Sequence, residues 1–241
     1  MISEAQQLFQ QIGNELGVAE CLQRLGNIYR MQDKNDEAIK MISDAQKQFQ
    51  TSGNQLQAAE CLWSLGEVYR MQKKYDEATE MIMKAQTQSE EIGYKAGVAD
   101  CLKILGIICM DQTKYDEAVD MFSNTQKKYQ NIGRIVDVAL CYENLGRTYR
   151  LQGQYEKAKE VFTKALKLLK GFPGEKYTIG WTLLNFGYLF FDMKDFVEAR
   201  RKYEEARDVF DSHGQLGKEV NHCSQALAKL DEAKPIASSS K

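Results

Sequence analysis

Cysteine is the residue type in this chain whose regular spacing first suggests metal binding or disulfide chemistry. Five of the six cysteines share one position of a repeating pattern: Cys21, Cys61, Cys101, Cys141 and Cys223. Equivalent residues of stacked helix pairs lie far apart, because each helix contact spans about 8–10 Å. A disulfide needs Cα atoms within about 7 Å, and zinc needs four converging ligands. We therefore predict buried structural thiols, and we expect the same of Cys109.

The two histidines, His213 and His222, belong to no recognisable catalytic or metal-binding motif. The sequence lacks His-x-x-x-His, Cys-x-x-Cys, Gly-x-Ser-x-Gly and phosphate-binding loop patterns. His222 precedes Cys223, but adjacent helical residues point in different directions and do not form a catalytic pair. The sequence therefore predicts a protein that is not an enzyme and that uses no metal and no cofactor.

Three arginines and one tryptophan are the residues that could recognise a partner. Arg30, Arg70 and Arg150 share one repeat position. An arginine can hold a carboxylate through two parallel hydrogen bonds. Trp63 lies outside the expected apolar stripe, where a large aromatic side chain often anchors a partner. These residues indicate a protein or peptide partner and favour an acidic one.

A solvated charged face is the alternative explanation of the same arginines. Glu67 can pair with Arg70 on its own helix, and Glu143 can pair with Arg147 in the same way. Acidic residues also occur at neighbouring repeat positions: Glu20, Glu60, Asp100, Asp111 and Asp192. The face is mixed in charge, and the sequence leaves both explanations open.

A pattern that returns every 40 residues, and once after 41, positions all of these side chains. The stretch Leu22-Gln-Arg-Leu-Gly-Asn-Ile-Tyr29 recurs in modified form at 62–69, 102–109, 142–149 and 183–190. A fixed period of this size indicates tandem structural repeats. Each repeat carries two apolar stripes with helical spacing, such as those within 18–29 and 38–49. With two prolines in the chain and no alternating strand pattern, we predict an all-α fold.

The expected organisation is a row of helix pairs with a partial repeat before it and a cap after it. Residues 1–13 match the second helix of a repeat, so they are either a truncated repeat or an N-terminal cap. Five repeats follow: 14–53, 54–93, 94–133, 134–173 and 174–214. A polar capping helix is expected at 215–234, and a disordered tail at 235–241.

Glycines mark the expected ends of the second helices. Most are single residues suited to a left-handed C-terminal cap: Gly13, Gly53, Gly93, Gly133 and Gly214. Repeat four ends instead in Gly171-Phe-Pro-Gly174, where we expect a longer turn.

Composition and charge exclude several classes of protein. The chain has 241 residues, of which 43% are hydrophobic and 27% are charged, and this is typical of a folded, soluble protein. The net charge of −2 gives no general affinity for nucleic acid or for an anionic membrane. No apolar run approaches 18 residues, and the N-terminus is not a signal peptide. We therefore expect a cytoplasmic protein.

The motif Leu22-x2-Leu25-Gly26-x2-Tyr29, followed by Ala38-x3-Ile42 and Ala45, resembles the tetratricopeptide repeat. The family's tryptophan position holds leucine or tyrosine, and its closing proline is replaced by polar residues. Without that proline the second helix can continue, which accounts for repeats longer than the usual ~34 residues. The repeats resemble the long-helix subclass of kinesin light chains and Pins-type adaptors, and the arrays of fungal STAND-type signalling ATPases.

The resemblance implies a right-handed α-solenoid whose first helices line a concave, peptide-binding face. Residues of the first helices outside the buried stripe are expected on that face: Gln23, Asn27, Arg30, Trp63, Glu67, Arg70, Lys103, Ile107, Met110, Glu143, Arg147, Arg150, Leu184, Tyr188 and Phe191. The candidate peptide-binding residues among them are Asn27, Arg30, Trp63, Glu67, Arg70, Lys103, Arg147, Arg150 and Tyr188.

Two functions follow from the resemblance. The first is a non-enzymatic adaptor that binds a peptide or a segment of a partner protein in the concave groove. The alternative is a structural or sensing segment of a larger STAND-type ATPase, acting through intramolecular or oligomeric contacts. The apolar residues Leu8, Phe9 and Ile12 also predict weak self-association through the N-terminal end.

Overall fold

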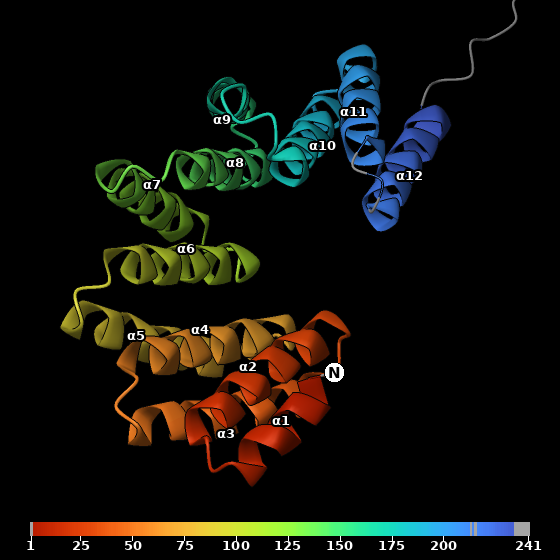
Figure 1. Cartoon of the computed structure of the whole chain (residues 1–241). Helices are drawn as coiled ribbons and strands as arrows, with labels where there is room; N and C mark the ends of the chain where they lie inside the picture. The colour runs from red at the N-terminus through yellow and green to blue at the C-terminus, as the bar shows by residue number, and fades with distance from the viewer. Residues whose placement is uncertain (1, 213, 215, 234–241) are drawn as a thin grey trace, which may run out of the picture. The chain divides into compact units, whose positions relative to one another are not determined.

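The structure is a computed structural model that describes residues 2–212, 214 and 216–233. Every regular element in this part of the chain is an α-helix, which confirms the predicted all-α fold (Figure 1). The described helices are α1 Ile2–Gln11, α2 Glu15–Met31, α3 Asn35–Thr51, α4 Gln55–Met71, α5 Tyr75–Glu91, α6 Lys95–Asp111, α7 Tyr115–Asn131, α8 Ile135–Leu151, α9 Tyr155–Leu169, α10 Lys176–Asp192, α11 Phe196–Asp211 and α12 Gly217–Ala233. The predicted disordered tail at 235–241 and His213 lie outside the described residues.

The helices form two compact units, Met1–Lys114 and Tyr115–Lys241. In unit 1 each helix from α1 to α5 packs against the next helix in the chain. The first helix α4 also contacts α2 and α6. In unit 2 the helices from α7 to α12 likewise pack in chain order, and α8 also contacts α10. Each unit is therefore a stack of helix pairs in which the first helices of successive pairs touch, as in an α-solenoid.

Glycine permits the close crossing of the two helices in a pair. A Cβ atom on Gly26 of α2 would lie 2.4 Å from Ile42 Cγ1 of α3, and one on Gly66 of α4 would lie 2.5 Å from Ile82 of α5. Such distances are too short for a real contact, so a larger residue would push the helices apart. The alanines of the second helices that share this interface, Ala38 and Ala78, are fully buried.

The turns between helices use the left-handed backbone region at two different places. The five glycines expected to cap second helices have φ between +68° and +77°, which confirms that prediction. The turns inside the helix pairs also use positive φ, but mostly at residues other than glycine: Asp33, Lys73, Thr113 and Lys194. The sequence did not indicate these, because only Gly153 among the equivalent positions is a glycine. L-residues pay a conformational cost in this region.

The predicted longer turn in repeat four is present. Residues 170–175 separate α9 from α10, whereas 52–54 separate α3 from α4. After α11, the helix α12 buries Cys223, Ala226, Leu227 and Leu230 and leaves most of its other side chains exposed, as expected of a cap. Arg200 of α11 forms an ion pair with Asp231 of α12.

The cysteines of the repeat column are thiols buried in the core, as predicted. Burial raises the pKa of Cys61 and of Cys101 to about 12, mainly because the thiolate would lose its hydration. Cys109 departs from the expectation, since it is only partly buried. It occupies the position of Tyr29 and Tyr69, which are partly exposed as well.

Candidate functional site

The first helices of unit 1 line a cleft of about 360 Å³, which we call the first-helix cleft. Three of the candidate residues, Asn27, Trp63 and Lys103, contribute to it. The full lining is Gln23, Asn27, Ala59, Glu60, Trp63, Ser64, Ser89, Tyr94, Gly97, Asp100, Cys101 and Lys103. Since these residues come from α2, α4, α6, the end of α5 and the turn before α6, the cleft spans three successive repeats.

One wall of the first-helix cleft carries polar groups that have no partner among the described residues. Gln23 and Asn27 on α2 and Glu60 on α4 form no hydrogen bond or ion pair with another described residue. The indole N–H of Trp63 is buried and finds no acceptor there either. An unsatisfied buried donor costs about 1–3 kcal/mol. This wall is therefore the part of the cleft that a bound ligand could satisfy.

The opposite wall satisfies its own polar groups. Lys103 Nζ donates to Asp100 Oδ1 at 3.2 Å, one turn away on α6. Ser89 Oγ donates to the carbonyl oxygen of Ala85 at 2.7 Å. Lys103 thus lies beside the cleft, but its charge is already engaged by a neighbouring carboxylate.

Arg70 connects two repeats of unit 1 and does not stand free. Its guanidinium bonds Glu67 Oε1 at 2.9 Å on its own helix and Asp111 Oδ2 at 3.0 Å on α6. Burial disfavours the charged form, but these two carboxylates outweigh it, so the pKa of Arg70 is raised. The pairing of Glu67 with Arg70 that the sequence suggested is present.

Arg30 differs from Arg70 because no carboxylate of the described chain reaches it. Met71 occupies the position equivalent to Asp111, one repeat earlier. The Nε atom of Arg30 is buried without a hydrogen-bond partner among the described residues. Of the two column arginines in unit 1, Arg30 is consequently the one whose bonding capacity is unused.

In unit 2 two of the candidate residues, Arg150 and Tyr188, join α8 to α10. Arg150 Nη1 bonds Asp192 Oδ2 at 3.0 Å, and its guanidinium carbon lies 5.7 Å from the ring centre of Tyr188. Arg147 Nη1 donates to Asn144 Oδ1 at 3.3 Å. Arg150 and Tyr188 are thus held between successive repeats, whereas Arg147 is held within α8.

A buried carboxylate lies in the same region of unit 2. Glu143 Oε1 accepts a 2.6 Å hydrogen bond from Asn185 Nδ2 and lies 3.9 Å from Arg147 Nε. Burial raises the pKa of Glu143, although Arg147 and Asn185 both act in the opposite direction. The expected pairing of Glu143 with Arg147 is therefore present, but in a desolvated setting.

Three residues expected on the exposed face are buried, so those predictions were wrong. Met110 is 4%, Glu143 is 6% and Leu184 is 0% exposed. Met110 replaces an arginine and lacks a charge to keep it in water. Glu143 lies on α8 and Leu184 lies on α10. These two first helices contact each other as well as the second helices of their own pairs, and this additional contact covers both residues.

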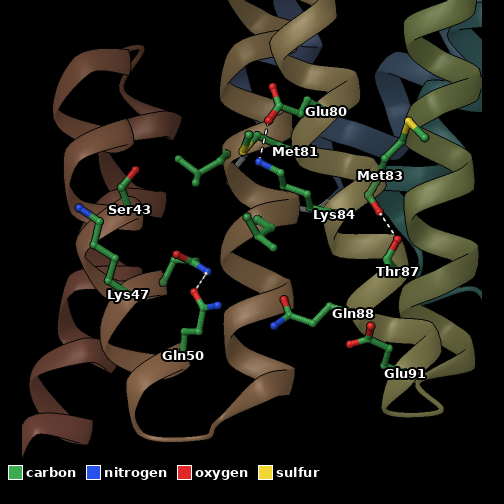
Figure 2. A pocket seen from close by; sticks show the side chains of 13 residues that line it. Ser43, Lys47, Gln50, Glu80, Met81, Met83, Lys84, Thr87, Gln88 and Glu91 are labelled. Atoms are coloured by element: carbon green, nitrogen blue, oxygen red, sulfur yellow. Dashed lines mark hydrogen bonds and ion pairs between the residues drawn. The ribbon is translucent and has the colours of Figure 1, made fainter.

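A larger groove lies on the second-helix side of unit 1, and the sequence analysis did not identify it. It has a volume of about 810 Å³ between α3 and α5, with Leu62 and Leu65 of α4 among its lining residues (Figure 2). Glu80 and Lys84 of its wall pair at 2.6 Å, and Gln46 bonds Gln50 at 3.0 Å. An equivalent groove of about 530 Å³ includes Met41 one repeat earlier. Because many of its polar groups bond each other, we consider it a weaker candidate than the first-helix cleft.

Metal and membrane sites were also sought in the described ranges. Residues 2–212, 214 and 216–233 contain no group of three or more His, Cys, Asp or Glu side chains that could hold a metal ion. In the same ranges no helix combines the length and the apolar character needed to cross a membrane.

Solved structures with the same fold include proteins of several kinds. BtubC (BKLC) from P. vanneervenii is 18% identical, with a TM-score of 0.69 over 89% of this chain and 88% of that chain. A Rap protein solved in complex with Competence and Sporulation Factor is 12% identical, with a TM-score of 0.70 over 96% of this chain and 68% of that chain. A STAND signal transduction ATPase with a tetratricopeptide repeat sensor, from Pyrococcus horikoshii, is 16% identical, with a TM-score of 0.69 over 95% of this chain and 36% of that chain.

Sequence comparison gives the family. A search of curated proteins found no match to this chain. The sequence profile of the tetratricopeptide repeat matches four overlapping stretches, residues 19–91, 57–131, 98–171 and 137–212. These stretches cover most of the chain and coincide with the helix pairs described above. The chain therefore belongs to the tetratricopeptide repeat family.

Proposed function

We propose that this chain is a non-enzymatic interaction module that binds an extended peptide segment of a partner protein in the first-helix cleft. The observation that carries this proposal is the wall of polar groups without partners beside Trp63. The amides of Gln23 and Asn27 are suited to bond the backbone of a peptide, since an amide both donates and accepts. Trp63 supplies the large aromatic surface that such contacts usually need.

The candidate residues outside the cleft have different roles in this proposal. Arg30 has unused bonding capacity and could contact a side chain or carboxyl group of the partner. Glu67 and Arg70, together with Asp111, hold α4 against α6, two of the helices that line the first-helix cleft. A binding role for Arg147, Arg150 and Tyr188 of unit 2 stays a prediction, and a partner would have to compete with their present contacts.

A selection of random peptides on the intact chain tests the proposal. We expect recovered peptides to lose roughly 30-fold in affinity on Trp63→Ala, the equivalent of about 2 kcal/mol. Met83→Ala is the matched control, because Met83 is an exposed residue of the second-helix groove. Failure to recover any peptide, or equal binding to the wild-type chain and Trp63→Ala, would overturn the proposal.

A sensing or structural segment of a STAND-type ATPase is the second candidate function. It is supported by the fold shared with the Pyrococcus horikoshii protein, whose repeats are described as a sensor. Here the partner segment would come from the same polypeptide or from another copy of it. A nucleotide-binding domain in the same reading frame would favour this candidate, and its absence there would favour the free-standing adaptor.

Self-association is a separate and weaker expectation. Leu8 of α1 is 60% exposed and Ile12, in the turn after α1, is 73% exposed, while Phe9 packs against Gly17. We propose that this apolar edge supports weak association between copies. Sedimentation of Leu8→Lys with Ile12→Lys should then show less concentration dependence than the wild-type chain.

A further inference from the structure

Two aromatic rings and two carboxylates line the first-helix cleft together, and we propose that it receives the cationic side chain of a basic peptide segment. The four residues are Trp63, Tyr94, Glu60 and Asp100. The inference rests on the proposed function and specifies the class of partner. The charge of this partner is positive, which is opposite to the charge of the acidic partner suggested by the arginine column.

The carboxylates on this side of unit 1 are not balanced by neighbouring cations. Glu60 is exposed and has no ion-pair partner among the described residues, and the same is true of Glu20, which occupies the equivalent position on α2. Asp100, at the third equivalent position, shares Lys103 at 3.2 Å. Two of these three acidic groups therefore lack a counter-charge, and a lysine or arginine of a partner would provide one.

The aromatic lining favours the same kind of ligand. The face of an indole ring attracts a lysine or arginine cation more strongly than the face of any other side chain does. No hydrogen bond from its indole N–H fixes Trp63 within the described chain. The ring can therefore adjust to a cation that enters between it and Glu60.

The two column arginines of unit 1, Arg30 and Arg70, lie too far along their helices to reverse the charge of the cleft. Arg70 follows Glu60 by ten residues on α4, which corresponds to about 15 Å along the helix axis. Its charge is also taken up by Glu67 and Asp111. Arg30 lies at the equivalent far end of α2. Arg24, the third arginine of unit 1, is exposed on α2 four residues after Glu20. The unbalanced carboxylate that lines the cleft itself is therefore Glu60 of α4.

The charge of peptides selected from a random library tests this inference directly. Selection on the intact chain at low salt should enrich lysine and arginine in the recovered peptides. Glu60→Gln should lower the affinity of a recovered basic peptide about twofold to fivefold, as expected for loss of one exposed ion pair. Adding 0.5 M salt should weaken binding to the wild-type chain more than binding to Glu60→Gln.

A matched control separates the cleft from the overall charge of the protein. Glu91→Gln removes the same charge from the second-helix groove and should leave the affinity unchanged. Trp63→Phe should weaken a peptide with a central arginine more than its counterpart with a central leucine, because only the arginine uses the stronger face of the indole.

The possible outcomes separate the two proposals. Recovery of basic peptides that are sensitive to both Glu60→Gln and Trp63→Ala supports the inference. Recovery of acidic or neutral peptides that depend on Trp63 would overturn it and leave the proposed function standing. Recovery of no peptide would overturn both.

Discussion

Arg70 and Asp111 join α4 to α6 through a 3.0 Å ion pair, and the same relationship recurs between Arg150 and Asp192 in unit 2. In each case the acidic residue belongs to the next repeat. There it lies one residue after the position that is equivalent to the arginine. Arg30 lacks such a partner because Met71 stands at that position. The arginine column thus contains two different kinds of residue, which the sequence pattern did not separate.

Arg70→Ala should destabilise the chain, whereas Arg30→Ala should not. Removing Arg70 leaves Glu67 and Asp111 as neighbouring, partly buried charges without their common counter-ion. Because these side chains are partly exposed, we expect a loss of only about 1 kcal/mol in the free energy of unfolding. Urea titration of both variants and of the wild-type chain measures the difference. Equal midpoints for Arg70→Ala and Arg30→Ala would contradict the assignment.

Glu143 should make stability depend on pH. Its pKa in the folded chain is raised above the ordinary 4.5, mainly by burial, so the native state holds the proton more tightly than the unfolded state does. The free energy of unfolding should therefore fall as pH rises through and above 4.5. Glu143→Gln removes this dependence and still offers Asn185 an acceptor. At pH 7 the variant should be more stable than the wild-type chain by about 1 kcal/mol.

Thermal or urea unfolding at pH 4, 5.5 and 7 provides the measurement for Glu143. The difference between variant and wild type should shrink toward pH 4, where the wild-type side chain is protonated. Glu117→Gln, at an exposed position of α7, serves as the control. A variant that is less stable at pH 7 would show that the contact with Arg147 outweighs burial.

Cys61→Asp should unfold or strongly destabilise the stack. Cys61 is 0% exposed, and the new carboxylate would lie without a counter-charge in the core. We expect a loss of about 3 kcal/mol or more. Cys61→Ala, which removes the sulfur without adding a charge, should cost about 1 kcal/mol. Circular dichroism during thermal unfolding distinguishes the two, and similar melting temperatures would refute the predicted burial.

Lys73→Gly should stabilise unit 1, although it replaces a residue by a more flexible one. Lys73 is exposed and has φ of +59°, where an L-residue is strained and glycine is not. The equivalent residue of repeat four is already a glycine, Gly153. We expect a gain of about 0.5–1 kcal/mol. Lys74→Gly, with φ of −85°, should bring no gain; a lower melting temperature for Lys73→Gly would contradict the argument.

The helices and their glycine caps could be predicted because they depend on short-range pattern. The period of 40 residues and the apolar stripes located each helix pair, and Gly53 marked a helix end that the backbone confirms. The positive φ of Lys73 could not be predicted in this way. A lysine carries no mark of the left-handed region, and the strain is accepted because the helices on either side fix the turn.

Burial on the first helices was harder to predict than their existence. The apolar stripe of a single helix indicates only which residues are buried against the other helix of the same pair. Leu184 and Glu143 are covered by contact between α8 and α10 in successive repeats. Trp63 was identified correctly as a residue beside the stripe, but the unsatisfied polar groups around it depend on three repeats at once.

The reactivity of the buried cysteines can report the local unfolding of individual repeats. Cys21, Cys61, Cys101 and Cys141 place one thiol in each of the first helices α2, α4, α6 and α8, while Thr182 takes that position in α10. A raised pKa and full burial keep Cys61 and Cys101 unreactive in the native state. An alkylating reagent can therefore modify each of them only when its own repeat opens. Mass spectrometry of the labelled peptides would then give the opening free energy of individual repeats in the unmodified chain.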